Sequence, residues 1–290
     1  MELTQKQRNQ IEKRFLEYIS NYDPEDPKIR LKTDHSFRVA GLSERIAAAD
    51  AAGLSGQAAA VDTDIPGQSA PVGSDLAWLI GLFHDIGRFE QVRRYGTFVD
   101  ARSVDHAGLG ADLLFQEGLL DRIAGPEQTA ASEPTAGPEL TAQEREIMEI
   151  SIRNHNRYRI QEGLPEQTAG YCHILRDADK IDIFRVLCDT PVEEIYNVTT
   201  DELRTAEVTE EVKECFRRRT AVPRPIKKTS VDNIVGHICL FFELVHPVSR
   251  RIALQQGYLD RLLRFRSESE GTRQWFEYMR GVFETEQVAE

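Results

Sequence analysis

The feature that most constrains this chain is an apolar stretch, Leu76–Ile86, that carries a histidine and an aspartate side by side. Nearly every residue in it is apolar, which predicts a helix buried in a core. We expect Gly87 to end this helix in the left-handed conformation. A buried carboxylate without a partner is strongly destabilising, so His84 and Asp85 need a cation, a hydrogen-bond network or both. A core histidine bonded to its neighbouring aspartate is the simpler alternative for this pair alone.

Helical spacing continues along the chain, and no convincing segment alternates apolar and polar residues with period two. The sequence therefore predicts an all-α protein. A first domain is expected at residues 1–190, with low-complexity insertions at about 50–74 and 125–138. Residues 191–290 are expected to form a C-terminal helical extension packed on the same core. Its helices are expected at roughly 208–219, 231–246, 249–265 and 272–286.

Several helix ends can be placed from capping signals. Thr4 and Thr141 each open a capping box, with Gln or Glu three residues later. A second helix is expected to start near residues 33–34, after a loop rich in Pro and Asp. Residues 93–98 are expected to form a loop, and Ser103 is expected to cap the helix that follows.

Composition argues against several classes of function. The net charge of −12 argues against a general nucleic-acid binder, although local arginine clusters leave a nucleotide substrate open. The four cysteines are scattered without C-x-x-C spacing, as in reduced core residues. No signal peptide is visible, and the most apolar run, 234–245, is too short to span a bilayer. We therefore expect a cytoplasmic protein with no membrane or nucleic-acid partner.

Six polar side chains accumulate on predicted helices, mostly on faces that they share with apolar residues. Any one of them alone is more often structural, but six together in a chain with seven histidines favour a binding site. Imidazoles and carboxylates suit a divalent transition metal (Fe, Mn, Co, Ni or Zn) better than calcium, and magnesium is also compatible. Gly110, one turn after His106, is expected to let another backbone come close. The predicted metal ligands are His35, His84, Asp85, His106, His155 and Asp179.

The order of these residues resembles the HD superfamily of metal-dependent phosphohydrolases, over about residues 30–190. Residues 84–87 are similar to the family's H-D-I-G form, and residues 178–181 are similar to its closing A-D-[KR]-x motif. His106 and His155 resemble the added ligands of members that hold two metals, such as HD-GYP phosphodiesterases and the bacterial HD hydrolases of diadenosine tetraphosphate. The Gly-Tyr-Pro signature is absent after His155, so cyclic-dinucleotide hydrolysis is not expected.

The resemblance implies an HD-domain helical bundle with extra C-terminal helices and a site for two metal ions. A metal-bound hydroxide would cleave a phosphate ester or anhydride of a nucleotide or another small metabolite. Asp85 would bridge the two ions. By the resemblance, the first ion would be held by His35, His84, Asp85 and Asp179, and the second by Asp85, His106 and His155.

Positive groups are needed for the substrate phosphate, because guanidinium forks suit phosphate oxygens. Arg88 is the first candidate and Arg157 the second, while most arginines near the ligands are expected to be solvated surface charges. Lys180 either neutralises developing charge or pairs with Asp177, which is itself an alternative to Asp179 as a ligand. The predicted catalytic residues are Asp85, Arg88 and Lys180.

The expected partner is a small phosphorylated, nucleotide-like substrate, and a homo-oligomer is compatible with the sequence. The competing hypothesis is a regulatory or interaction module that keeps the metal site without turnover. In that case the helices after residue 190 would serve a partner.

Overall fold

The computed structural model describes residues 1–52, 72–126, 139–191 and 198–289. These residues form helices and contain no strand, which confirms the all-α prediction. The predicted insertions lie largely outside the described residues. The chain divides into two compact units, Met1–Ala178 and Asp179–Glu290. The domain boundary near residue 190 and the packing of the C-terminal extension on the same core stay predictions.

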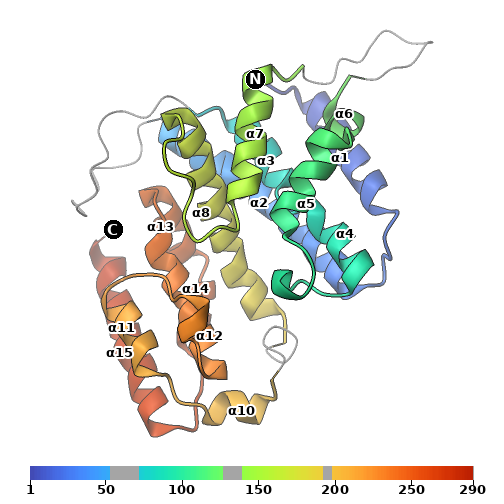
Figure 1. Ribbon diagram of the computed structural model, residues 1–290. Helices are drawn as coiled ribbons and strands as arrows, with labels where there is room; N and C mark the ends of the chain where they lie inside the picture. The colour runs from blue at the N-terminus through green and yellow to red at the C-terminus, as the bar shows by residue number, and fades with distance from the viewer. Residues whose placement is uncertain (53–71, 127–138, 192–197, 290) are drawn as a thin grey trace. The chain divides into compact units, whose positions relative to one another are not determined.

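The first unit contains seven complete helices within its described residues, and an eighth, α8, crosses the unit boundary (Figure 1). Two short segments, the 3-10 helix η1 and the π-helix η2, flank α5. The bounds are α1 Gln5–Ile19, α2 Pro27–Ala51, α3 Ser74–Phe83, α4 Ile86–Tyr95, η1 Asp100–Arg102, α5 His106–Ala111, η2 Asp112–Gln116, α6 Leu119–Ala124, α7 Ala142–Asn154 and α8 Glu166–Asp189.

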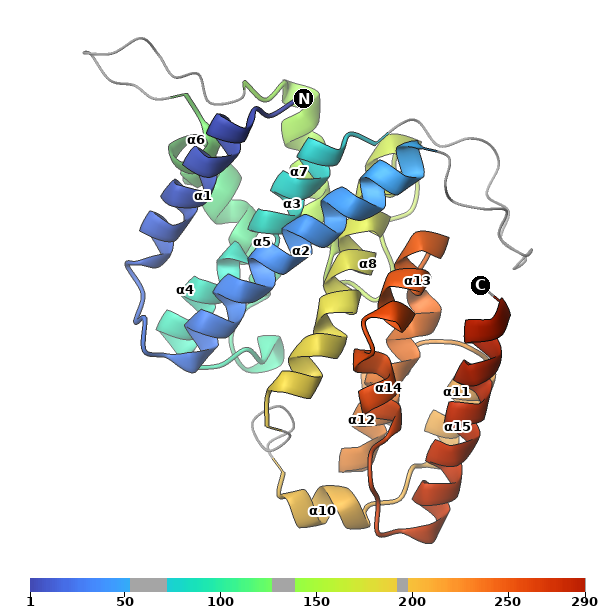
Figure 2. The same cartoon turned by 180° about the vertical axis from the view of Figure 1, so that it is seen from behind.

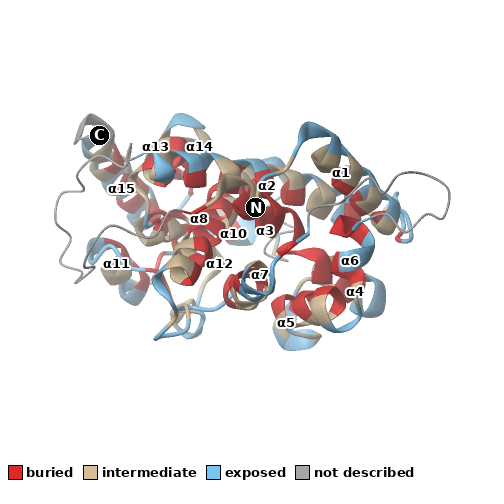
Figure 3. Ribbon diagram, turned by 90° about the horizontal axis from the view of Figure 1, so that it is seen from above, coloured by how far each residue is buried: buried red, intermediate tan, exposed pale blue. Residues whose placement is uncertain are grey.

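Helix α3 is the centre of the first unit's core, as the apolar stretch predicts. Every residue from Leu76 to Phe83 is buried (Figure 3). Helix α2 lies along α3 (Figure 2). A Cβ atom at Gly81 would lie 2.8 Å from the Cα of Ala40, so the glycine permits this close backbone approach.

The central helix ends earlier than predicted. It stops at Phe83, and two residues separate it from α4, whereas the apolar pattern predicted a helix through Ile86. The prediction for Gly87 is also wrong, because this residue lies inside α4 with a negative φ. Its function is close approach: a Cβ there would collide with the carbonyl oxygen of His106 and lie 2.6 Å from the nitrogen of Gly110. The expected close backbone contact at Gly110 is confirmed.

Other helix ends agree with the predictions at some positions and differ at others. Both predicted capping boxes, at Thr4 and Thr141, are present. Helix α2 begins well before residues 33–34, because Asp26 caps it and a proline occupies its first position, where no amide donor is needed. Helix α4 includes residues 93–95, which were expected to be a loop, and α5 is capped by Asp105 instead of Ser103.

The second unit is also helical over its described residues. Phe216 anchors an aromatic cluster, with its ring centroid 5.3 Å from Phe242 and 5.7 Å from Trp275. The predicted helix at 231–246 changes to a 3-10 helix after Ile238. Nowhere in the described part of either unit is a helix long and apolar enough to cross a membrane. The bounds are α10 Thr200–Thr205, α11 Glu210–Arg217, η3 Arg224–Ile226, α12 Ser230–Ile238, η4 Cys239–Glu243, α13 Pro247–Gln255, α14 Tyr258–Leu263 and α15 Glu270–Ala289.

Candidate metal centre

Five of the six predicted metal ligands lie in the first unit. There the structure brings the four histidines together around the carboxylate of Asp85. Only His35 lies in the middle of a helix, α2. The expectation that the ligands lie within helices holds for His106, the first residue of α5, and is wrong for His84, Asp85 and His155, which lie just outside helix ends. His84 follows the last residue of α3, Asp85 precedes α4, His106 opens α5 and His155 follows α7. All five are buried.

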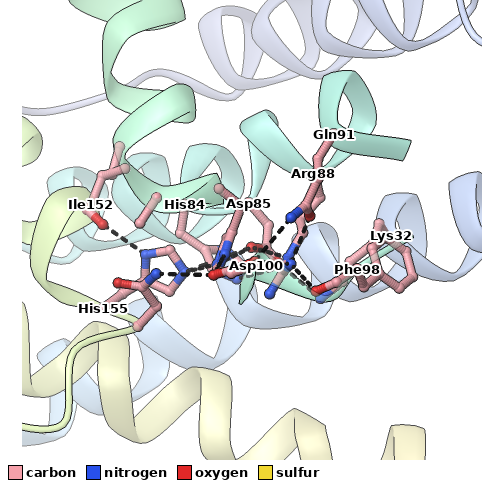
Figure 4. Close-up of polar contacts among 12 residues, drawn as sticks. Lys32, His84, Asp85, Arg88, Gln91, Phe98, Asp100, Ile152 and His155 are labelled. Carbon is pink, nitrogen blue, oxygen red and sulfur yellow. Dashed lines mark hydrogen bonds and ion pairs between the residues drawn. The ribbon is translucent and has the colours of Figure 1, made fainter. Parts of the chain in front are cut away.

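The Asp85 carboxylate divides the four imidazoles into two pairs. Its Oδ2 lies 3.5 Å from Nε2 of His84 and 3.6 Å from Nε2 of His35. Its Oδ1 lies 3.4 Å from Nε2 of His106 and 3.6 Å from Nε2 of His155. We call these groups the Oδ2 half-site (Asp85 Oδ2, His35, His84) and the Oδ1 half-site (Asp85 Oδ1, His106, His155). Figure 4 shows Asp85 at the centre of this network.

Two imidazoles are oriented by the helices that they terminate. Nδ1 of His84 lies 2.7 Å from the carbonyl oxygen of Gly81, and Nδ1 of His155 lies 2.7 Å from that of Ile152. A carbonyl oxygen only accepts, so each Nδ1 carries the proton and donates it to a carbonyl of the last helical turn. Each Nε2 therefore presents a lone pair towards Asp85, as a metal-ligating histidine does.

His106 is oriented instead by Asp100, a residue that the sequence analysis missed. Its Nδ1 lies 2.7 Å from Asp100 Oδ2. Asp100 Oδ1 accepts hydrogen bonds from Nη1 of Arg88 at 2.8 Å and from Nε2 of Gln91 at 2.9 Å. Burial would raise the pKa of the Asp100 carboxyl, but the hydrogen bond from His106 and the charge of Arg88 hold that pKa well below its usual value. Asp100 is thus an anion that joins His106 to Arg88.

The Oδ1 half-site fits a cation. Burial lowers the pKa of His106 to about 4 despite its contacts with Asp100 and Asp85, so its imidazole is neutral at pH 7. Its Nε2 lies 3.0 Å from Nε2 of His155, and with both Nδ1 atoms protonated the two lone pairs face each other. Asp85 Oδ1 faces the same space, is buried and accepts no hydrogen bond. A divalent ion would satisfy all three atoms.

At the Oδ2 half-site, a lysine that the sequence analysis missed contacts Asp85. Nζ of Lys32 lies 2.6 Å from Asp85 Oδ2 (Figure 4). Burial would raise the pKa of the Asp85 carboxyl, but the charges around it, that of Lys32 foremost, hold it well below the usual value. The available sequence signal was position, because Lys32 lies one turn before His35 on the same helix.

Arg88, the first candidate for phosphate binding, lies beside the site but is held in place. Its Nη1 donates to Asp100, to Gln91 and to the carbonyl oxygen of Phe98, and its Nε lies 3.6 Å from Asp85 Oδ1. Arg157, the second candidate, is exposed. The other arginines near the ligands include Arg93 and Arg94, which pair with Glu90, and Arg153, which pairs with Asp112 and Glu149.

The remaining predicted residues lie on α8. Asp179 is the first residue of the second unit and is half-buried, and Lys180 beside it is buried. Asp177, the alternative to Asp179, is fully buried. Directly before it in the chain, the buried Arg176 donates to the carbonyl oxygens of His155, Asn154, Arg157 and Tyr158. This guanidinium fixes the segment that follows α7.

Comparison with known proteins is consistent with this geometry. The sequence model of the HD domain family matches residues 33–183, just over half of the chain. The chain belongs to the HD domain family. Searches of curated proteins and of solved structures gave no match. HD domains bind divalent metals and are usually metal-dependent phosphohydrolases, and the matched region contains all six predicted ligands.

Proposed function

We propose that this HD domain protein is a phosphohydrolase that uses two divalent cations to cleave a phosphate ester or anhydride of a small, nucleotide-like molecule. The proposal rests on the way the two oxygens of the Asp85 carboxylate separate the four imidazoles into two pairs. Each carboxylate oxygen faces its own pair of imidazole Nε2 atoms, at 3.4–3.6 Å. A bridging carboxylate with nitrogen ligands on both sides is a binuclear donor set.

The predicted ligands indicate where each cation would bind and which metals are compatible. The Oδ2 half-site would hold the first cation, with Asp179 added on the strength of the closing motif, and the Oδ1 half-site would hold the second. Neutral imidazoles and carboxylates favour Fe, Mn, Co, Ni or Zn, with magnesium also compatible. Two such cations would supply Lewis-acid chemistry, lowering the pKa of a water molecule and neutralising phosphate oxygens.

The chain's own residues would position the substrate. The Arg88 guanidinium stands next to Asp85 Oδ1 and is fixed by Asp100, so it can meet a phosphate bound across the two half-sites without a large loss of side-chain entropy. Lys180 would neutralise charge that develops on the phosphate. The buried ligands exclude bulk water, which strengthens each of these electrostatic contacts.

Metal counting and a phosphate-release screen test this proposal together. Protein reconstituted with Mn²⁺ or Co²⁺ should hold two ions per chain and release phosphate from members of a nucleotide and aryl phosphate panel. A chelator should abolish the release, and His84→Ala should lose metal and activity together. His237→Gln is the matched control, because this histidine lies on α12 in the second unit.

Two outcomes would overturn the proposal. A wild-type protein that never holds more than one ion at saturation would contradict the binuclear site. A protein that holds two ions and hydrolyses no member of the panel would instead support the regulatory module.

A further inference from the structure

Lys32 contacts the Asp85 oxygen to which the first cation would bind. Its ammonium lies 2.6 Å from Asp85 Oδ2, the oxygen that also faces the Nε2 atoms of His84 and His35. The Lys32 side chain is 15% exposed and that of Asp85 is 3% exposed, so a nearly buried cation pairs with a buried anion. Charges are paired so closely in a core because an isolated buried carboxylate is very unfavourable.

The charges of the ammonium and of a metal ion at this oxygen oppose each other. A metal ligated by imidazole and carboxylate lies about 2.0–2.2 Å from each donor atom. It would therefore stand within a few ångströms of Nζ in its present position, and two cations at that distance repel strongly. Because a carboxylate oxygen has more than one lone pair, this repulsion weakens binding of the first cation and does not exclude it.

The Lys32 ammonium also has a second contact, beside its ion pair with Asp85. Nζ of Lys32 lies 5.6 Å from the centroid of the Phe98 ring, within the range of a cation–π contact. The four-carbon stem of lysine is flexible, and the side chain already reaches solvent. The ammonium can thus move outward while the helix that carries it stays in place.

We propose that Lys32 is a built-in competitor for the first cation. In the metal-free protein its ammonium neutralises Asp85 and keeps the carboxylate ordered between the two half-sites. Its charge repels an incoming metal ion, so Lys32 lowers the affinity of the Oδ2 half-site and limits that half-site to strongly binding ions. The idea rests on the metal-binding part of the proposed function, not on turnover.

Metal titration by calorimetry, without substrate, tests the competition. The titration uses His155→Ala protein, in which only the Oδ2 half-site remains complete. In that background Lys32→Met should bind Mn²⁺ roughly 10- to 1000-fold more tightly, since a neighbouring positive charge lowers the proton affinity of a carboxylate by about one to three powers of ten and acts on its metal affinity in the same direction. Lys28→Met is the matched control, because Lys28 is an exposed lysine one turn earlier on α2. Lys32→Arg should bind like wild type.

A second variant covers the case in which metal-free Lys32→Met does not fold. Lys32→Gln keeps a hydrogen-bond donor for Asp85 but removes the charge, and it should also bind the ion more tightly. Affinities in Lys32→Met and Lys32→Gln equal to or weaker than that in Lys28→Met would overturn the proposal. Because no hydrolysis is measured, tighter binding in a protein without phosphatase activity would contradict only the proposed function.

Discussion

Replacing Asp100 by asparagine should weaken the second cation selectively. In the wild type, Asp100 Oδ2 accepts from Nδ1 of His106 at 2.7 Å, and Oδ1 accepts from Arg88 and Gln91. An asparagine side chain has only one oxygen, so it can accept from His106 or from Arg88 and Gln91, but not from both. If its oxygen faces Arg88, its NH₂ group faces His106 Nδ1, which must then give up its proton. That proton moves to Nε2 and removes the lone pair from the Oδ1 half-site.

The opposite orientation of the amide is no better. With the oxygen towards His106, the NH₂ group would face the donors of Arg88 and Gln91. Either way, at least one hydrogen bond to a charged group is lost, worth about 1.5–3 kcal/mol. Since each 1.4 kcal/mol is about a factor of ten, the affinity for the second cation should fall roughly 10- to 100-fold.

Calorimetric titration of the metal-free protein with Mn²⁺ measures this directly. Asp100→Asn should show a weakened second event and an unchanged first event. Asp121→Asn is the control, because Asp121 is an exposed carboxylate of α6 that pairs with Arg145 and belongs to neither half-site. Two binding events with wild-type affinities in Asp100→Asn would refute the reasoning that Asp100 fixes the His106 tautomer.

Three further outcomes follow from the structure. His155→Ala should reduce the metal content at saturation from two ions per chain to one, counted by elemental analysis. Gly87→Ala should lower the free energy of unfolding by about 1–3 kcal/mol, because the new Cβ meets the backbone of α5. Gly41 has open space around it, so Gly41→Ala should raise that free energy by about 0.5–1 kcal/mol. Denaturant titrations measure both changes. Burial, with the nearby charges of Lys227 and Arg224, lowers the pKa of His237 to about 3 from 6.5, so the unfolded chain takes up this proton first as the pH falls. Stability should therefore fall between pH 6.5 and 3 by up to about 1.4 kcal/mol per pH unit from this group, and His237→Gln should flatten that slope.

The sequence predicted the parts of this protein that depend on side-chain type and helical period. The buried helix α3, both capping boxes and the close contact at Gly110 are present in the structure. The histidines of the site were found because an imidazole on an apolar helix face is chemically unusual. The ligand roles themselves stay predictions until metal is counted.

The sequence could not predict features set by backbone geometry and by distant contacts. The apolar composition continues past Phe83, so nothing in the pattern marks the break before His84. Lys32 and Asp100 look like ordinary solvated charges along the chain. Their importance comes from contacts that only folding creates, such as the ion pair between Lys32 and Asp85, 53 positions apart.

Two of the predicted ligands, His84 and His155, cap the helices that precede them, so the length of each helix sets the direction of an imidazole. His84 and His155 each bond the carbonyl three residues earlier, so the same contact ends the helix and aims the imidazole. One residue inserted into α3 or α7 would turn everything after it by about 100° and advance it by about 1.5 Å. Such an insertion would disturb the packing of the buried helix α3 and would also make the donor atom point elsewhere. Relatives with an altered ligand set should therefore be sought first among chains whose α3 or α7 differs in length by a fraction of a turn.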